Sequence, residues 1–191
     1  MSLKHAILGF LSYTPLSGYH LKKAFDNSVQ HFWPANQSQI YRTLAELERD
    51  GFVEKEVIER EERLDMKIYS ITAGGRAELD QWLATFPPER AEREPFLIQL
   101  FFGGNLSDDE LLNLMQHKLR EIEQRLAVYE AVYAANVNAP KKVADERAVF
   151  LSWLTLEVGY QNNQAIAQWL RSAIERIESK NYSIQIGTTN E

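Results

Sequence analysis

Four polar side chains near the middle of the N-terminal half have the chemistry needed to read a DNA duplex. They are Ser38, Gln39, Tyr41 and Arg42. An arginine can donate two hydrogen bonds to a guanine edge, and a glutamine amide can both donate to and accept from adenine in the major groove. The alternative is a solvated helix face. We predict DNA contact by these residues, because a separate apolar face accounts for the packing of the same segment.

The segment that carries these residues is predicted to be an amphipathic helix from about Gln37 to Asp50. Asn36 is a suitable N-cap, and Gln39 three residues later completes the pattern of a capping box. Gly51 is a suitable residue to follow the helix, because glycine adopts a left-handed conformation at little cost. The free N–H groups at the start of such a helix can also bind phosphate. The residues that would pack inward recur at helical spacing, and they are Ile40, Leu44 and Leu47.

Two β-rich runs follow this helix and indicate a hairpin, or wing. The runs are Phe52–Ile58 and Lys67–Ile71, and the polar segment EREERLD separates them. Two helices are predicted to come earlier, one over residues 2–13 and one capped by Ser17, and a further helix would follow a cap at Thr72. This order of elements is typical of a winged helix-turn-helix, a fold that usually places one helix in the major groove.

The C-terminal half is predicted to be entirely helical. One long helix opens at Ser107, and a second covers roughly Lys142 to Lys180. The first carries a seven-residue apolar repeat typical of a coiled-coil-like seam, formed by Leu112, Met115, Leu119, Ile122, Leu126, Tyr129 and Tyr133. The second carries apolar residues that we interpret as one face, namely Phe150, Leu154, Val158, Ile166, Trp169, Leu170, Ala173 and Ile177.

The predicted fold class is therefore mainly α with a small β wing. An N-terminal winged helix-turn-helix is joined to an all-helical dimerisation domain. The boundaries that we predict are a DNA-binding domain at 1–86, a linker at 87–94, a helical dimerisation and effector domain at 95–182, and a disordered tail at 183–191.

The composition limits the classes of function. The chain has 191 residues, no cysteine and a net charge of −6. The lack of cysteine excludes disulfides and thiolate metal sites, and the acidic charge weakly disfavours a nucleic-acid partner. We expect no metal site, no cofactor and no catalysis, because no Gly-rich phosphate loop, nucleophile elbow or metal-binding His pair occurs. With no signal cleavage site and no apolar run long enough to span a membrane, we expect a cytoplasmic protein.

Several segments together resemble the PadR family of transcriptional regulators. The matching pieces are ILGFLSYTPLSGYHLKKAF, IYRTLAELERDGFV and KIYSITAGGRAEL, within the first 86 residues. FLIQLFFGG and WLTLEVGYQNNQAIAQWL are similar to the long helical dimerisation domain of larger members. The resemblance implies a homodimer on a two-fold-related operator in double-stranded DNA, and repression that a small molecule relieves.

The resemblance also assigns residues. Tyr41 and the residues before it match the DNA-facing start of the recognition helix, Tyr19 matches the second helix, and Lys67 and Tyr69 match the wing. This wing tip departs from the family, whose tips often carry Gly, Pro and Arg, because EREERLD has two positive and four negative residues. Arg63 and Lys67 are therefore the remaining candidates for wing contact. Lys22 and Lys23 are candidates for contact with the DNA backbone, and the alternative is that they are only solvated.

Aromatic residues suggest an effector site. Phe32, Trp33, Phe96, Phe101 and Trp153 could line a cavity, between the N-terminal domain and the long helices, for a planar apolar or phenolic effector. The alternative, which we favour for any single residue, is packing in the core or the dimer interface.

The sequence thus predicts a DNA-binding transcriptional regulator, and it favours a repressor over an activator. A rival interpretation is a protein–protein interaction module that uses the acidic winged helix without DNA. A third, and the weakest, is a small-molecule carrier or a helical enzyme.

Overall fold

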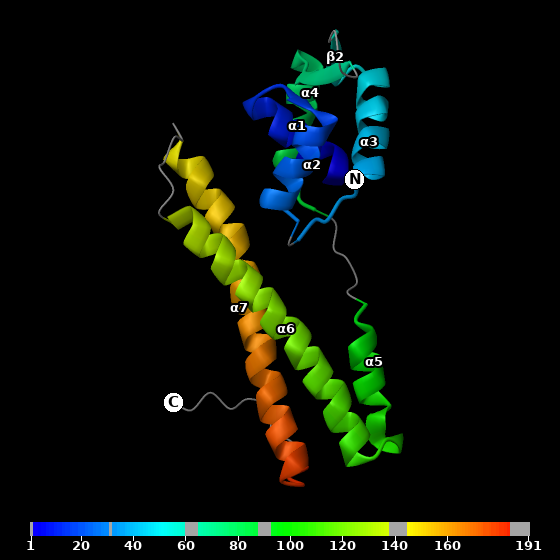
Figure 1. Cartoon of the computed structure of the whole chain (residues 1–191), viewed down its shortest axis with the longest axis vertical. Helices are drawn as coiled ribbons and strands as arrows, with labels where there is room; N and C mark the ends of the chain where they lie inside the picture. Colours follow the sequence, from blue (N-terminus) through cyan, green and yellow to red (C-terminus); the bar gives the residue numbers. More distant parts are fainter. Residues whose placement is uncertain (1, 31, 60–64, 88–92, 138–144, 184–191) are drawn as a thin grey trace. The chain divides into compact units, whose positions relative to one another are not determined.

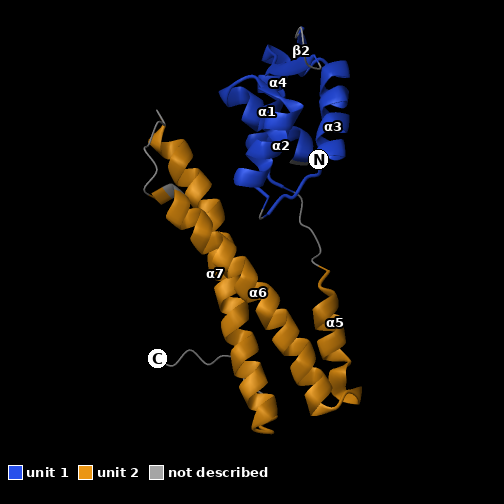
Figure 2. Ribbon diagram, in the orientation of Figure 1, with its two compact units in different colours: residues 1–90 blue, residues 91–191 orange. Residues whose placement is uncertain are grey.

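The structure is a computed structural model that describes residues 2–30, 32–59, 65–87, 93–137 and 145–183. Two compact units make up the chain, unit 1 at Met1–Arg90 and unit 2 at Ala91–Glu191 (Figure 2). The division between them falls within the segment predicted to be a linker.

Unit 1 is the predicted winged helix-turn-helix. Its elements are α1 (Ser2–Tyr13), β1 (Leu16–Ser17), α2 (Gly18–Asn27), α3 (Gln37–Arg49), β2 (Val53–Ile58), β3 (Met66–Ile71) and α4 (Ala73–Leu83) (Figure 1). The strands form an antiparallel sheet in the order β1-β3-β2. The two-residue strand β1 is not predicted from the sequence, and it pairs Leu16 with Tyr69.

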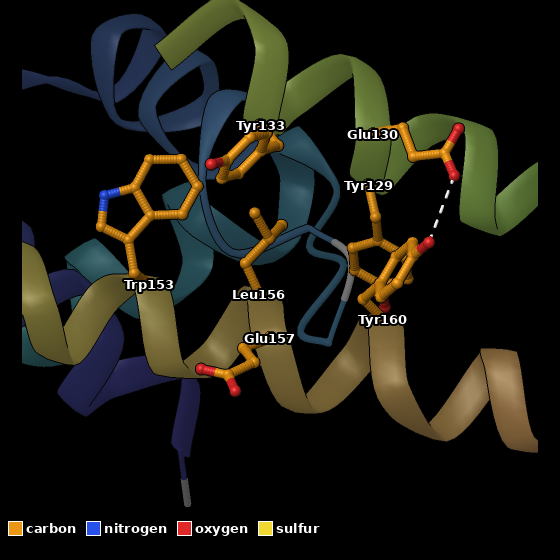
Figure 3. Close-up of a pocket in the computed structure, with 7 residues that line it drawn as sticks. All are labelled: Tyr129, Glu130, Tyr133, Trp153, Leu156, Glu157 and Tyr160. Carbon is orange, nitrogen blue, oxygen red and sulfur yellow. Dashed lines mark hydrogen bonds between the residues drawn. The ribbon is translucent and has the colours of Figure 1, made fainter. Parts of the chain in front are cut away.

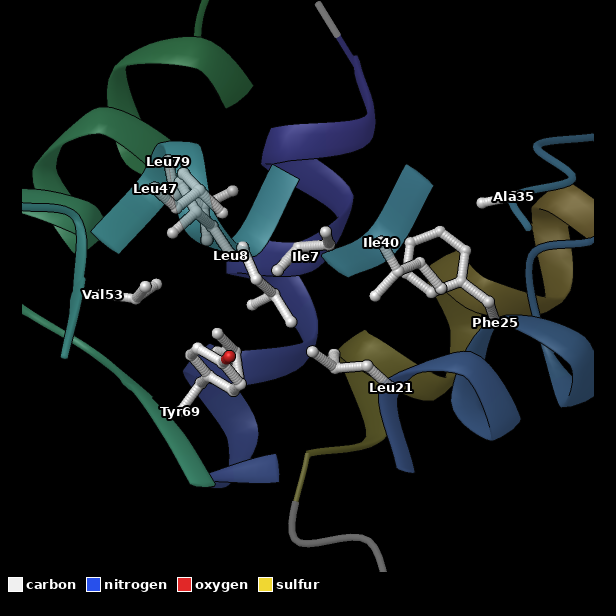
Figure 4. Close-up of a cluster of buried hydrophobic side chains, with 12 residues drawn as sticks. Ile7, Leu8, Leu21, Phe25, Ala35, Ile40, Leu47, Val53, Tyr69 and Leu79 are labelled. Atoms are coloured by element: carbon white, nitrogen blue, oxygen red, sulfur yellow. The ribbon is translucent and has the colours of Figure 1, made fainter. Parts of the chain in front are cut away.

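The core of unit 1 lies between α1, α2 and α3 (Figure 4). Ile40, Leu44 and Leu47 are buried, which confirms the predicted inner face of α3. The same helix therefore turns its opposite side to solvent. The other fully buried side chains of this core are Ile7, Leu8, Leu11, Leu21 and Phe25.

The end of α3 is built as the sequence predicts. Gly51 has a φ of 74°, the left-handed conformation that glycine tolerates. Its N–H donates to the carbonyl of Glu48 at 3.1 Å, and the N–H of Phe52 donates to the carbonyl of Leu47 at 2.9 Å. These two bonds form a Schellman motif, which turns the chain from α3 directly into the wing.

Unit 2 contains α5 (Pro95–Phe101), a 3-10 helix (Gly103–Asn105), α6 (Asp108–Val137) and α7 (Glu146–Glu178). The long helices α6 and α7 lie side by side (Figure 1). The predicted seam of α6 is largely confirmed, because Met115, Ile122 and Tyr129 are buried, whereas Tyr133 is exposed. The predicted start of α7 at Lys142 falls outside the described residues, and within them the helix begins at Glu146.

The helix α5 is not predicted from the sequence. Pro95 occupies its first turn, and the carboxylate of Glu94 accepts the N–H of Phe96 at 3.3 Å. Glu94 also pairs with Lys118 of α6 at 3.2 Å, and this pairing lowers the pKa of the Glu94 carboxyl. The ion pair therefore fixes the start of α5 against α6.

The apolar residues of α7 lie on two faces and not on the single face that we predicted. Leu156, Ala167, Leu170 and Ile174 are buried. The outer face consists of exposed apolar side chains, namely Phe150, Leu151, Leu154, Val158, Ile166 and Trp169.

No helix among the described residues is both long and apolar enough to cross a membrane. Within the same residues, no group of three or more His, Cys, Asp or Glu side chains could hold a metal ion.

Candidate nucleic-acid interface

The start of α3 is fixed by a capping box. The side chain of Asn36 accepts the N–H of Gln39 at 2.9 Å, and the side-chain oxygen of Gln39 accepts the N–H of Asn36 at the same distance. The side-chain carbonyl oxygen of Gln39 is used in this cap. While the capping box is intact, Gln39 therefore cannot present both its side-chain oxygen and its NH₂ group to adenine. Its NH₂ group stays available as a donor.

The exposed face of α3 presents Ser38, Tyr41 and Arg42 to solvent. No acidic residue in the described part of the chain forms an ion pair with Arg42. Arg49, at the C-terminal end of α3, by contrast pairs with Asp50 at 3.2 Å. The positive charge of Arg42 is thus available to a ligand near the N-terminus of the helix, where recognition helices contact bases.

A polar groove joins this face of α3 to α2 and β3. Its volume is about 660 Å³. It brings together three residues singled out in the sequence, Tyr19 of α2, Tyr41 of α3 and Lys67 of β3. The remaining lining residues are Ser17, Gly18, His20, Asp65 and Met66.

Two of those lining residues, Ser17 and His20, were not predicted as site residues. Ser17 caps α2 by accepting the N–H of His20 at 3.2 Å, and its hydroxyl also lies 2.9 Å from Nδ1 of the same histidine. His20 follows the predicted cap Ser17 by three residues, and this spacing could have identified His20 from the sequence. The imidazole of His20 is thus a second polar group beside Tyr19.

Neither Tyr69 nor Lys22 is among the residues that line this groove. Tyr69 is only 5% exposed and packs in the core near Leu8 (Figure 4), where burial raises the pKa of its hydroxyl. Lys22 forms an ion pair with Asp26, one turn along α2. Arg63 lies outside the described residues. Burial argues against direct DNA contact by Tyr69, since its side chain cannot reach a groove of the DNA without leaving the protein core.

A further cation in the described part of the wing is already paired. Lys55 of β2 lies opposite Tyr69 and forms an ion pair with Glu48 of α3 at 2.7 Å. This hydrogen-bonded pair raises the pKa of the Lys55 amine. It links the wing to the recognition helix.

The predicted effector residues come from both units. Phe32 and Trp33 belong to unit 1, where Phe32 is exposed and Trp33 packs against the core. In unit 2, Phe96 is buried in the core and Phe101 is 82% exposed. Trp153 lines a pocket that lies between α6 and α7 (Figure 3). It is called the aromatic pocket below, and its lining is Tyr129, Glu130, Tyr133, Trp153, Leu156, Glu157 and Tyr160.

The fold and the exposed start of α3 define a winged-helix DNA-binding unit joined to a unit of long helices. Residues 7–81 match the model of the transcriptional regulator PadR-like family. Residues 92–178 match the C-terminal model of the virulence activator alpha family. The chain belongs to the PadR-like family of transcriptional regulators.

Curated relatives match along nearly the whole chain. The negative transcriptional regulator PadR of Bacillus subtilis is 28% identical over 177 residues, which cover 92% of this chain and 97% of the relative. A probable transcriptional regulator of Mycobacterium tuberculosis is 30% identical over 190 residues, covering 94% of this chain and 100% of the relative.

Solved structures show the same architecture. Bacillus subtilis PadR in complex with operator DNA has a TM-score of 0.80 at 28% identity, with 93% of this chain and 99% of that chain covered. Bacillus subtilis PadR in complex with p-coumaric acid has a TM-score of 0.77 at 28% identity, with 92% and 95% covered. The predicted fold class and family are therefore confirmed.

Proposed function

We propose that the protein is a homodimeric repressor that binds an operator in double-stranded DNA and that a small molecule releases. The observation that supports this most strongly is the division of α3 into a fully packed inner face and an exposed polar start. Ser38, Tyr41 and Arg42 would face the major groove, with the NH₂ group of Gln39 beside them. Tyr19 and Lys67, which line the same groove of the protein, would contact the flanking phosphates.

The outer face of α7 supports the dimer. Its apolar side chains are exposed on the single chain, with Val158 at 55%, and exposed apolar stripes of this extent mark interaction surfaces. A second copy of the same helix would cover it by two-fold symmetry. The dimer would hold two copies of α3 apart by about one duplex turn, roughly 34 Å.

Release by an effector is the finer part of the proposal. The complex of Bacillus subtilis PadR with p-coumaric acid supports a small-molecule ligand in this family. A ligand can change operator affinity only by binding one dimer geometry better than the other. The aromatic pocket of unit 2 is a candidate cavity for a small-molecule effector. The proposed site of action is the cytoplasm.

The proposal is tested by fluorescence anisotropy with DNA from upstream of the protein's own coding region. We expect tight binding to this DNA and weak binding to a scrambled duplex of equal length. Affinity should fall by about a thousandfold or more between 50 and 200 mM salt, since a dimer contacts on the order of six to ten phosphates. Equal binding to both duplexes, with recovery of a protein partner instead, would favour the interaction-module interpretation.

Gly18→Ala is expected to weaken operator binding by about tenfold without unfolding the protein. A Cβ on Gly18 would lie 2.5 Å from Cε1 of Tyr41, so the tyrosine ring must shift from its position in the groove. Alanine at the start of α2 costs no helix stability, because its helix propensity exceeds that of glycine. Anisotropy and thermal unfolding measure the two effects.

The control for this variant is Gly9→Ala. Gly9 lies in α1, and a Cβ there would meet no atom within 4 Å. It should stabilise the helix slightly and leave operator affinity unchanged. If Gly18→Ala also left operator affinity unchanged, Tyr41 would have no role in binding.

A further inference from the structure

The aromatic pocket combines ring faces with negative charge. Its volume is about 470 Å³, and it opens between α6 and α7 within unit 2. Four of its seven lining residues are aromatic, namely Tyr129, Tyr133, Trp153 and Tyr160, and Leu156 is the single aliphatic one (Figure 3). The remaining two are Glu130 and Glu157. The pocket is thus apolar in its walls and acidic at its polar positions.

Both carboxylates are held by neutral donors. The hydroxyl of Tyr160 donates to Oε1 of Glu130 at 3.3 Å, and this bond crosses from α7 to α6 (Figure 3). The amide of Gln161 donates to Oε1 of Glu157 at 3.0 Å. A neutral hydrogen-bond donor orients a carboxylate but leaves its charge in place. The two glutamates are also exposed to solvent.

The aromatic rings favour the same kind of ligand as the carboxylates. Tyr133 and Trp153 meet edge to face, with ring centroids 5.4 Å apart and an interplanar angle of 70°. Ring faces carry negative partial charge and attract cations, most strongly at tryptophan. An anion in this pocket would meet like charge from both the ring faces and the glutamates.

We propose that the aromatic pocket binds a planar aromatic cation and discriminates against phenolate or carboxylate ligands of similar size. The rings would stack on the ligand, and Glu130 and Glu157 would face its positive charge. The ligand class thus differs from p-coumarate, to which Bacillus subtilis PadR is bound in one solved structure. The inference that the pocket binds a cation does not rest on the proposed function. The inference that this binding switches operator affinity does rest on it.

The charge preference is tested by isothermal titration calorimetry on the full-length protein at mildly alkaline pH. The probes are N-methylacridinium, acridine, which is neutral under these conditions, and p-coumarate. We expect N-methylacridinium to bind at least about tenfold more tightly than acridine, by ion-pair and cation–π attraction together. We expect p-coumarate to bind most weakly. Equal affinity for the cation and the neutral analogue, or tighter binding of p-coumarate, would overturn the proposal.

Variants locate the binding site. The double variant Glu130→Gln with Glu157→Gln keeps both hydrogen-bond acceptors and removes both charges. It should lower affinity for N-methylacridinium by about fivefold to tenfold and leave acridine binding unchanged. Trp153→Leu should weaken binding of the cation by a similar factor through the loss of its best ring face. If the double variant bound the cation as tightly as the unaltered protein, the site would lie elsewhere.

The matched control is Glu175→Gln. It removes the same charge from an exposed position on α7, about 27 Å along the helix from Glu157. Affinity for the cation should be unchanged, which separates a local effect from a change in net charge.

The regulatory role has a separate readout. Operator binding is measured by anisotropy with and without saturating N-methylacridinium. A fall in operator affinity that the double glutamate variant abolishes would support the pocket as the effector site. Tight, glutamate-dependent binding of the cation with unchanged operator affinity would uphold the binding site and overturn only its role as a switch.

Discussion

Val158→Glu is expected to convert the protein to a monomer and to lower its operator affinity by about a hundredfold or more. Val158 lies at the centre of the outer apolar face of α7 and is 55% exposed on the single chain. In a two-fold interface each substitution occurs twice, and burying an unpaired carboxylate costs several kcal/mol. A monomer presents one copy of α3, so it would lose half of the base and phosphate contacts. Light scattering reports the mass, and anisotropy reports the affinity.

Gln164→Glu is the control for that variant. Gln164 is also exposed on α7 but lies about 120° around the helix from Val158, away from the outer apolar face. The same charge there should leave both the dimer and operator binding intact. A Val158→Glu protein that stayed dimeric would place the interface elsewhere.

Arg42→Ala should reduce operator affinity by about thirtyfold or more while the dimer and the fold stay unchanged. An arginine that donates two hydrogen bonds to a base contributes about 1–3 kcal/mol, and a dimer would lose this contribution in both half-sites. Arg42 is exposed, so its removal leaves no cavity. Anisotropy on the operator and circular dichroism measure the two properties.

Arg49→Ala is the matched control. It removes the same side chain from the last turn of α3, where Arg49 pairs with Asp50 and lies far from the proposed base contacts. We expect an effect below about threefold, mainly through weaker attraction to phosphate. Equal losses in the two variants would show that α3 contributes general positive charge and no base contact.

The parts of the fold that were predicted correctly depend on local chemistry. The capping box at Asn36 and the glycine at position 51 need only neighbouring residues, so their signals survive in a single sequence. The inner face of α3 follows from helical spacing for the same reason. Such features need no knowledge of distant contacts.

The missed elements depend on distant contacts. The strand β1 has two residues, and only its pairing with β3 makes it a strand. In α5, an apolar run interrupted only by Gln99 carries no helical period, so its conformation is not evident until Glu94 and Lys118 join it to α6. Both faces of α7 consist of apolar side chains, so they differ only in the elements that pack against them. The helix α6 packs against one of the two faces.

The exposure of the predicted contact residues could be inferred from the sequence only in part. Lys67 and Tyr69 share one side of a strand by alternation, but Tyr69 is covered by the core and Lys67, near the strand's start, is exposed. The ion pair of Lys22 with Asp26 could have been found from their spacing of four residues. The aromatic pocket could not, because it depends on how α6 and α7 align across residues that are far apart in the chain.

Hydroxyl-radical footprinting on the DNA upstream of the protein's own coding region tests the central claim most directly. If two copies of α3 read the operator, two protected half-sites should appear with two-fold symmetry, their centres about one duplex turn, or roughly 34 Å, apart. Arg42→Ala should remove both together. A single protected half-site, protection without symmetry, or no protection at concentrations where the protein is dimeric would contradict it.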